Sequence, residues 1–451
     1  MSAELVEQAL GLSRADGCMV VVGRTSRIDL RWAGNSLTTD GASRDLSIAV
    51  ISVVDGAVGV RSASSADDVE GLVRASEAAA RSAEPADDAG PLVEGPADAD
   101  FGAPADDAAI AVLDRFAREL GDSFASARAD GLRLYGYATH SVDTTWLGTS
   151  TGLRRRHSAP SGYVEVTGKD GSPGGSSWVG TSTRDWTDVD VPALEAELRR
   201  RLSWGARRLD LPAGRYETLL PPSAVADLMV SMYWHSAGRD AAEGRSVFSR
   251  PGGGTRVGER LGPPGLSLRS DPHDPGLGAV PFAVATSSSS VTSVFDNGMD
   301  LPGTDWIADG HLAALVETRA TARERGVPVT PYVHDLSLDG GGTATTDEMV
   351  SRTERGLLLT CLWYIREVDP QTLLLTGLTR DGVFLVEDGE VVAAVNNFRF
   401  NDSPVGLLGR ITEVGRAERT LPREMSDYFT WVRMPTLRVP DFHMSSVSQA
   451  S

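Results

Sequence analysis

Two aspartate–glycine pairs divide the apolar residues near the C-terminal end of this 451-residue chain. They are Asp381 with Gly382 and Asp388 with Gly389, inside the run TLLLTGLTRDGVFLVEDGEVVAAV. Aspartate and glycine both tolerate the positive φ angles that tight hairpin turns require. The apolar stretches beside them are short and rich in residues that favour strands. The pattern therefore predicts antiparallel strands joined by a hairpin turn at 380–382 and a second turn at 388–389.

The chain as a whole divides into four segments. Residues 1–83 have the pattern of an α+β unit, and residues 110–210 that of a helix and antiparallel strands completing an N-terminal region. An acidic connector rich in proline and glycine, residues 84–109, separates them, and a β-rich domain follows over residues 211–451. The fold class expected is α+β: an N-terminal α/β region with antiparallel strands and helices, then a β-rich C-terminal domain packed on a central helix.

Charge is unevenly distributed between two of these segments. The connector holds eight acidic side chains and no basic one, which predicts a solvated, mobile segment. Arg154, Arg155, Arg156 and His157 form a basic cluster, expected to be an exposed strand end. The net charge of −19 leaves no global basic face for nucleic acid and disfavours anionic membranes.

Compartment and chemistry are constrained by what the sequence lacks. Cys18 and Cys361 lie in apolar runs and are expected to be free, buried thiols. No apolar run approaches the ~20 residues of a membrane span, and the N-terminal residues lack signal-peptide features. We therefore expect a cytoplasmic protein without membrane or nucleic-acid partners. The phosphate-loop motif GxxxxGK[ST] and the nucleophile motif GxSxG are both absent.

The stretch WHSAGRDAAEGRSVF, residues 234–248, resembles the active-site helix of a zinc peptidase that has lost its catalytic residues. Such a helix presents two ligands on one face and a carboxylate that takes a proton from the metal-bound water. His235 could be a ligand, but Ser236 follows it where the base belongs, and Arg239 would repel a metal ion. Asp240 and Glu243 remain as weak candidates.

The alternative is an ordinary helix without metal chemistry. His235 then packs beside Tyr233 and Trp234, and Arg239 pairs with Asp240 or Glu243.

Several stretches, taken in order, resemble the TldD/PmbA group of metallopeptidase-related proteins over nearly the whole chain. They are DGAVGVRSASSADDVEGLVRASEAAARSA, LPPSAVADLMVSMYWHSAGRDAAEGRSVFSRPGGGTRVGERLG, VFDNGMDLPGTDWIADGHLAALVETRATARERGVPVT and DPQTLLLTGLTRDGVFLVEDGEVV. The TldD-type members of that group carry an HExxxH motif and a late cysteine. Here His235, Ser236 and Asp240 stand at the motif positions, and Cys361 lies too early to be the late cysteine. The resemblance is therefore to a TldE (PmbA)-type subunit, which lacks the motif.

This resemblance implies a heterodimer with a TldD-like HExxxH subunit that supplies zinc and cuts unfolded or small peptides. The present chain would need no cofactor and would shape the chamber and hold the peptide. His235, Arg239, Glu243, Arg245 and Asp296 are the residues expected in the substrate or partner groove. Two alternatives stay open: an independent divergent hydrolase using His235, Asp240 and Glu243, and a non-enzymatic peptide-binding dimer.

Overall fold

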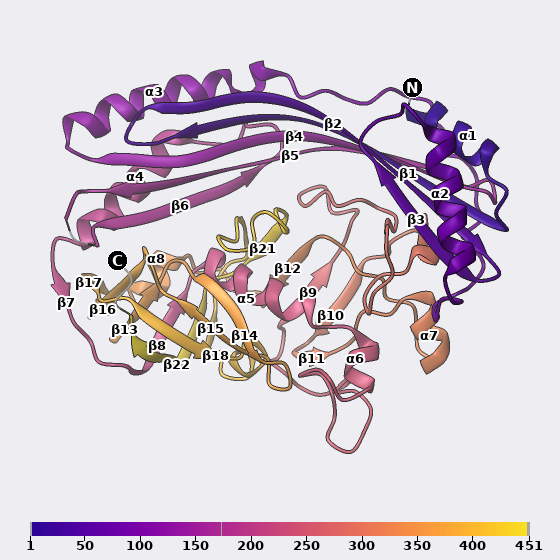
Figure 1. The fold of residues 1–451 in the computed structure, drawn as a ribbon. Coiled ribbons are helices and arrows are strands. Elements are labelled where there is room, and N and C mark those ends of the chain that lie inside the picture. The colour runs from indigo at the N-terminus through magenta and orange to yellow at the C-terminus, as the bar shows by residue number, and fades with distance from the viewer. Residues whose placement is uncertain (1, 173, 449–451) are drawn as a thin grey trace.

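A computed structural model describes residues 2–172 and 174–448 of the chain. Figure 1 shows a long curved sheet lying over a C-terminal body. In the described residues this sheet has six antiparallel strands in the order β3-β2-β1-β4-β5-β6. The strands are β1 (Gly17–Trp32), β2 (Leu37–Val54), β3 (Ala57–Ala63), β4 (Arg133–Thr149), β5 (Arg154–Lys169) and β6 (Ser176–Thr183).

Helices cover one face of this sheet, and the other face is turned toward the C-terminal body (Figure 1). They are α1 (Ser2–Leu12), α2 (Val69–Ser82), η1 (Ile110–Leu113), α3 (Asp114–Ala129) and α4 (Val191–Trp204). Alternation along β1 places Ile28 and Trp32 on the covered face, where they pack with Phe116 and Phe124 of α3. Among the described residues, no helix is long and apolar enough to cross a membrane.

Part of the uncovered face packs on the C-terminal body through apolar residues such as Met19 and Val21. Another part is polar and meets the body across a cavity of about 330 Å³. Arg27 and Tyr137 of the sheet line this cavity together with Ser426 from the body. The Tyr163 hydroxyl spans the two parts by donating to Asp427 Oδ1 at 3.2 Å. The underside of the sheet is therefore apolar where it packs on the body and polar around this cavity.

Residues 84–109 are held against the sheet at several points, so the expected mobile connector is wrong there, although most of these residues are exposed as expected. Phe101 is buried, and its carbonyl accepts the Trp146 indole N–H at 3.0 Å. Arg155 Nη1 lies 3.2 Å from Asp98 Oδ1, and Arg156 Nη1 lies 2.9 Å from Asp100 Oδ2. The basic cluster is likewise no exposed strand end, because the Arg156 side chain is only 8% exposed. Each charged segment is the partner of the other.

In the described part of residues 208–448, two further sheets form the C-terminal body. One has six strands: β9 (Ser267–Ser270), β10 (Thr304–Ala308), β11 (His311–Leu312), β12 (Leu336–Asp339), β20 (Glu418–Thr420) and β21 (Val432–Met434). The other has ten: β7 (Arg208–Leu209), β8 (Gly214–Leu220), β13 (Arg355–Leu359), β14 (Trp363–Asp369), β15 (Leu374–Leu378), β16 (Val383–Glu387), β17 (Glu390–Val395), β18 (Phe398–Asp402), β19 (Glu413–Val414) and β22 (Leu437–Val447). Short helices η2 (Val294–Asp296), α7 (Arg319–Arg325), α8 (Thr346–Val350) and α9 (Pro404–Leu408) connect them.

One of the two predicted turns is a hairpin and the other is not. Asp388 and Gly389 join the paired strands β16 and β17, with φ angles of 50° and 83°. The hairpin predicted at 380–382 is wrong, because β15 pairs with β14 and β18 while β16 pairs with β13 and β17. Asp381 has the expected positive φ of 66°. Its carboxylate accepts a hydrogen bond from Arg423.

A single helix, α5 (Pro222–Trp234), forms the centre of the C-terminal body. Every residue from Pro222 to Tyr233 is buried, because apolar residues occupy all sides of the helix. It packs against β8, β20 and β21 and against α9. The α+β class with a β-rich C-terminal domain on a central helix is confirmed.

Candidate functional site

The helix α5 ends at the first residue of the candidate motif. His235 is its C-terminal cap, and Ala237 forms a parallel bridge with Val316. The Val316 N–H donates to Ser236 O at 2.8 Å, and the Gly238 N–H donates to Val316 O at 2.9 Å. A short helix, α6 (Gly238–Ala242), starts only after this bridge. The continuous helix expected through 234–248 is therefore wrong, and the residues after His235 do not share a helix face with it.

Both nitrogens of His235 face acceptors. Nδ1 lies 2.7 Å from the carbonyl oxygen of Ser231, one turn back in α5. Nε2 lies 2.5 Å from Glu367 Oε2 on β14, and both side chains are about a third exposed, at 33% and 32%. The Ser231 carbonyl can only accept, so Nδ1 donates to it, while Nε2 is in direct contact with the carboxyl group of Glu367. In this arrangement both ring nitrogens are occupied by oxygen atoms of the chain, so neither is free to bind a metal ion.

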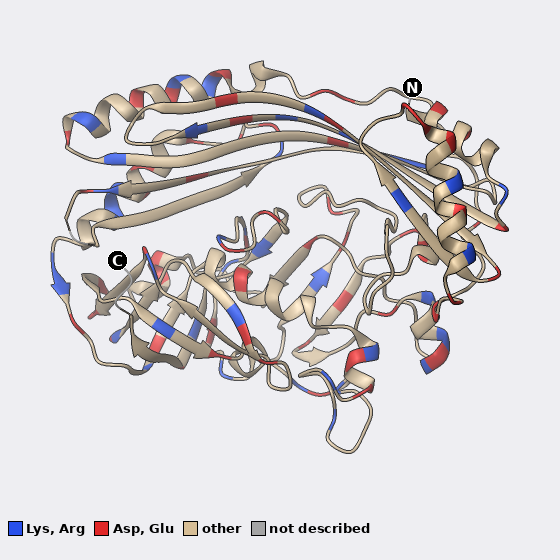
Figure 2. Cartoon of the chain, in the orientation of Figure 1, with Lys and Arg blue, Asp and Glu red and all other residues tan. Residues whose placement is uncertain are grey.

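The charged residues that follow His235 pair with one another on α6. Arg239 Nε lies 3.0 Å from Glu243 Oε1, which is the pairing expected for an ordinary helix. Arg245 contacts Asp240 Oδ1 at 2.5 Å and also Glu243. Figure 2 shows these mixed charges on α6, which lies on the side of the body away from the long sheet. The structure does not bring Arg239, Glu243 and Arg245 into a common groove with His235.

Asp296 lies elsewhere, at the end of η2. Its carboxylate accepts the Arg319 Nε–H at 2.8 Å and the Arg319 backbone N–H at 3.2 Å. Burial raises the pKa of Asp296 even though Arg319 opposes the shift. It lines a cavity of about 240 Å³ that also contains Tyr332 and His334.

A larger cavity of about 520 Å³ lies at the C-terminal end of α5, beside the His235–Glu367 pair. We call it the aromatic groove, and its lining residues are Trp234, Tyr332, His334, Ile365, Arg366, Glu424, Met425 and Tyr428. Trp234 and Tyr428 meet edge to face, with ring centroids 5.5 Å apart. Tyr428 is 69% exposed, which is unusual for a large side chain and leaves its ring free to contact a ligand.

The wall made by Tyr332 and His334 belongs both to the aromatic groove and to the cavity that contains Asp296. The ring of His334 opens to the groove, while the protein around it lowers its pKa by desolvation. A neutral imidazole beside aromatic rings suits apolar and hydrogen-bonding ligands better than anions.

The buried carboxyl of Asp227 fixes the groove loop to α5. Its Oδ1 accepts the backbone N–H groups of Glu424 at 3.0 Å and Met425 at 3.2 Å. Burial raises the pKa of Asp227 well above its ordinary value. The Glu424 carboxylate in turn accepts the Tyr364 N–H and pairs with Arg366 at 3.1 Å. One helix thus positions both the aromatic wall at Trp234 and the loop that carries Tyr428.

Of the residues that line this groove, the sequence analysis singled out only the stretch that begins at Trp234. Tyr332, Glu424 and Tyr428 come from segments far from residue 234 and follow no recognisable spacing. The one usable signal is the run YWH at the end of an otherwise apolar helix, which marks where α5 leaves the core.

Residues 213–446 match the family model for the PmbA/TldA metallopeptidase C-terminal domain, which is more than half of the chain. The chain belongs to the PmbA/TldD family. No curated protein matches it in sequence.

Solved structures share the fold of this PmbA/TldD-family protein along its full length. TldE from Thermococcus kodakarensis has a TM-score of 0.78 at 16% identity, with 98% of each chain covered. A Thermotoga maritima protein, described as a candidate modulator of a DNA gyrase, has a TM-score of 0.76 at 16% identity, covering 98% of this chain and 99% of the other. A Bacteroides thetaiotaomicron protein with a similar description has 0.76 at 14%, with 98% of each covered.

The metal of a metallopeptidase does not fit the side chains of this family member. Among the described residues, no group of three or more histidine, cysteine, aspartate or glutamate side chains is placed to hold a metal ion. His235, the one matching ligand, is held by Ser231 and Glu367, and Asp240 is paired with Arg245. The family's chemistry therefore cannot be assigned to this chain's own residues at the end of α5.

Proposed function

We propose that this chain is the TldE-type, non-catalytic subunit of a cytoplasmic two-subunit metallopeptidase. A TldD-like partner with an HExxxH motif supplies the zinc and cuts the peptide. The present chain closes the chamber and holds an unfolded or small peptide in the aromatic groove. Membership of the PmbA/TldD family supports the peptidase context. The state of His235, with both nitrogens engaged by acceptors, carries the non-catalytic assignment.

The groove supports a role in holding peptide. Its rings offer contact surface without requiring a particular side chain, and Tyr and Trp lose little conformational entropy on binding. Arg366 and Glu424 at its edge can orient polar backbone or charged groups of the peptide. Such a mixture of aromatic walls and a few polar groups is typical of ligand sites.

The deciding experiment is co-expression with a paralogue that carries HExxxH and a late cysteine. We expect the two chains to purify as one complex and only the pair to cleave an unfolded peptide. Replacing the first histidine of the paralogue's motif should abolish cleavage, whereas His235→Ala in this chain should leave turnover intact. His235 is about a third exposed, so its loss should also leave the fold intact.

Two results would contradict the proposal and identify the alternatives. Cleavage by this chain alone, lost in His235→Ala, would make it an independent hydrolase. Peptide binding by a homodimer that ignores the paralogue would make it a binding protein without a peptidase role.

A further inference from the structure

The outer edge of β2 is open over more than half of the strand. β1 pairs with β2 along its inner side, whereas β3 pairs only with residues 48–54 on its outer side (Figure 1). In the described part of the chain, no strand or isolated bridge lies beside residues 37–47 on that side. Their outward N–H and C=O groups therefore face solvent and can pair with another strand. We call the regular part of this segment, residues 39–47, the β2 edge.

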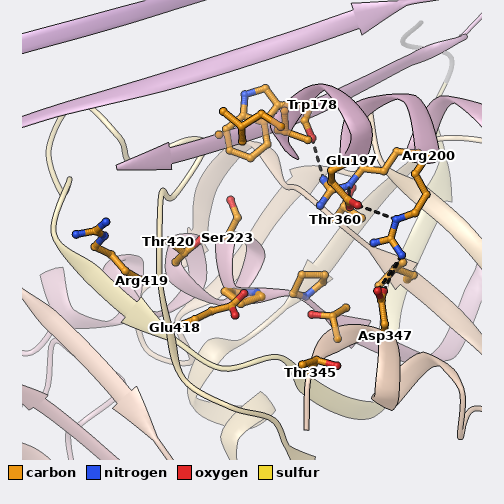
Figure 3. Close-up of a pocket in the computed structure, with 18 of the residues that line it drawn as sticks. Trp178, Glu197, Arg200, Ser223, Thr345, Asp347, Thr360, Glu418, Arg419 and Thr420 are labelled. Carbon is orange, nitrogen blue, oxygen red and sulfur yellow. Dashed lines mark hydrogen bonds and ion pairs between the residues drawn. The ribbon is translucent and has the colours of Figure 1, made fainter. Parts of the chain in front are cut away.

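The opposite edge of the long sheet, at β6, already contacts the C-terminal body. Trp178 of β6 packs with Cys361 and Leu421. Nearby, Arg200 of α4 pairs with Asp347 of α8 at 2.9 Å, at the wall of a cavity of about 340 Å³ (Figure 3). Side chains of the same protein therefore occupy the β6 end of the sheet.

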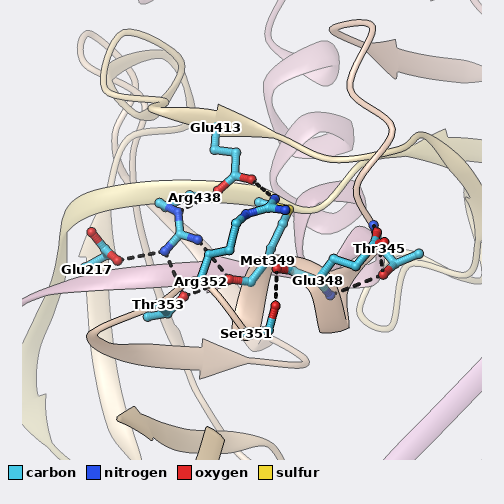
Figure 4. A network of polar contacts seen from close by, with 9 residues as sticks. All are labelled: Glu217, Thr345, Glu348, Met349, Ser351, Arg352, Thr353, Glu413 and Arg438. Carbon is cyan, nitrogen blue, oxygen red and sulfur yellow. Dashed lines mark hydrogen bonds and ion pairs between the residues drawn. The ribbon is translucent and has the colours of Figure 1, made fainter. Parts of the chain in front are cut away.

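The helix α8 at this contact is fixed in turn to the ten-stranded sheet. Arg438 of β22 donates to Thr353 Oγ1 at 2.8 Å and to Met349 O at 2.9 Å, at the end of the helix (Figure 4). The same guanidinium lies 2.8 Å from Glu413 of β19. The long sheet is thus held to the body on its β6 side, and its β2 side is the one that can meet another molecule.

Charges of both signs lie on the β2 edge, symmetrically about Ala42. Asp40 precedes Ala42 by two residues, and Arg44 follows it by two. The Arg44 side chain is 71% exposed although its Nε lies 3.2 Å from Asp107 Oδ1, so it can bind a second carboxylate. Among the residues that the structure describes, no cation pairs with Asp40. An edge guarded against pairing carries charges that repel a second copy, whereas Asp40 and Arg44 attract one.

The geometry of antiparallel pairing restricts how two such edges can meet. Residues directly opposite each other point their N–H and C=O groups either both toward the partner strand or both away from it. Because this direction alternates along a strand, two identical strands related by a twofold axis must have that axis at a residue, and not between two residues. An axis at Asp40 or Arg44 opposes like charges, and an axis at position 41 or 43 opposes each charge to a neutral residue. An axis at Ala42 opposes Asp40 to Arg44 twice.

We infer that a second copy of this chain binds at the β2 edge, with the two β2 strands antiparallel about a twofold axis at Ala42. The Asp40 carboxylate of each copy then faces the Arg44 guanidinium of the other, on the same side of the sheet. The residues around the axis are small, and a Cβ added at Gly41 would meet nothing within 4 Å. The backbones can therefore approach to hydrogen-bonding distance without a steric obstacle.

This pairing makes the two long sheets continuous and goes beyond the proposed function, because it does not involve the aromatic groove. Every residue that lines the groove belongs to the C-terminal body. A single pair of strands is small beside the roughly 800 Å² per partner of a standard interface, so we expect a dissociation constant of about 10–100 µM. The net charge of −19 per chain opposes association at low ionic strength, and about 0.15 M salt screens this repulsion.

Sedimentation equilibrium of the full chain, from about 1 to 200 µM in about 0.15 M salt, tests the pairing. We expect a monomer at the lowest concentrations and a dimer at the highest. Asp40→Arg brings like charges together and should weaken the dimer at least about tenfold, and Arg44→Asp should do the same. The double variant with both changes restores opposite charges and should return the dissociation constant to within about threefold of the parent value. Glu390→Arg, which makes the same change of charge at the exposed end of β17, is the matched control.

A cross-linking experiment tests the register. Both natural cysteines are buried, so a cysteine introduced on the β2 edge is the reactive thiol. Ala42→Cys places one thiol of each copy beside the axis, with Cβ atoms about 5 Å apart, and a short bis-maleimide should join two chains. Ser47→Cys, at an exposed position of the same edge, leaves the two thiols roughly 34 Å apart and should give no cross-linked dimer.

The inference is overturned if the chain stays monomeric at about 200 µM, if Asp40→Arg leaves the dimer unchanged, if the double variant does not restore it, or if Ala42→Cys is not cross-linked. A chain that is monomeric alone, but whose Asp40→Arg variant no longer co-purifies with the TldD-like paralogue, would assign the edge to the contact between the two subunits instead. Peptide cleavage by the two-subunit complex is measured separately, so failure of the proposed function is distinguishable. A thermal melt of each variant at about 1 µM shows whether the monomer has folded.

Discussion

Arg423 Nη2 lies 2.8 Å from Asp381 Oδ2 in the interior, where both side chains are about nine-tenths buried. The guanidinium lies over the rings of Trp363 and Trp178, at 4.6 and 5.6 Å from their centroids. It also contacts the buried sulfur of Cys361 at 3.1 Å. This ion pair joins two segments: the one that precedes the groove residues Glu424 and Met425, and the turn between β15 and β16.

Removing the arginine alone should destabilise the protein strongly. Arg423→Met leaves Asp381 buried beside a neutral side chain, and breaking a buried pair in this way costs about 3–5 kcal/mol of unfolding free energy. The double variant with Asp381→Asn removes the stranded charge and should recover a large part of that loss. Urea unfolding measures both. A single variant within about 1 kcal/mol of the parent would show that the pair contributes little.

Asp335 should make stability fall as the pH rises from about 4 to about 7. Burial raises the pKa of this carboxyl to about 7, while an unfolded aspartate has a pKa of about 3.9. Between these values the folded protein keeps a proton that the unfolded chain releases, so unfolding becomes easier as the pH rises, by up to roughly 4 kcal/mol. Asp335→Asn should flatten this slope in urea unfolding at a series of pH values. Asp339→Asn, exposed on the same strand, should leave the slope unchanged.

A side chain at Gly238, at the interruption after α5, would displace a buried ion pair. A Cβ there would lie 1.8 Å from Glu317 Oε1, and this buried carboxylate is held by Arg325 at 3.0 Å. Gly238→Ala should therefore lower the unfolding free energy by about 2–4 kcal/mol. Gly121→Ala on the exposed side of α3, where nothing lies within 4 Å, should instead raise it by about 0.5–1 kcal/mol. Equal changes in unfolding free energy for Gly238→Ala and Gly121→Ala would show that Gly238 is not crowded.

Tyr428→Ala should weaken peptide capture without unfolding the chain, because its ring is exposed in the aromatic groove. We expect the KM of the two-subunit complex to rise about fivefold to tenfold with little change in kcat, as removal of a binding contact predicts. Leu37→Ala, at an exposed large side chain on the long sheet, is the control. An unchanged KM in Tyr428→Ala would exclude the groove as the place where peptide is held.

Arg156→Ala should release the acidic segment from the sheet. The arginine is buried and pairs with Asp100 and Asp106, so its loss should cost about 1–2 kcal/mol and expose residues 84–109 to limited proteolysis. Arg44→Ala breaks only an exposed pair with Asp107 and should change neither measurement. Identical digestion patterns in the two variants would show that Arg156 does not hold the segment.

The sequence predicted elements whose cause is local and missed those whose cause lies elsewhere in the chain. The turn at Asp388 with Gly389 needs only positive φ angles, and the hairpin is there. The same dipeptide at Asp381 does not join paired strands, because β15 pairs with β14 and β18 while β16 pairs with β13 and β17, partners set by the rest of the sheet. The acidic segment and the arginines of β5 were each interpreted alone, whereas they pair with each other.

In the candidate site too, features with a local cause were visible in the sequence, and features that depend on distant residues were not. The departures of Ser236 and Asp240 from HExxxH were visible in the sequence, but the break after His235 depends on the bridge to Val316. Tyr332 and Tyr428 reach the groove through tertiary packing, which leaves no spacing to detect.

The burial of α5 has a consequence for how a family of this kind can divide labour between paralogues. Twelve of its thirteen residues are buried, so packing in the core constrains which side chains these positions can carry. The residues that would carry peptidase chemistry begin where the helix emerges, at His235. His235, Asp240 and Glu243 are only partly buried, so substitutions at these three positions cost folding little, whereas Gly238 between them is fixed by packing. One copy of a duplicated gene can therefore change the chemistry of these positions and keep its shape.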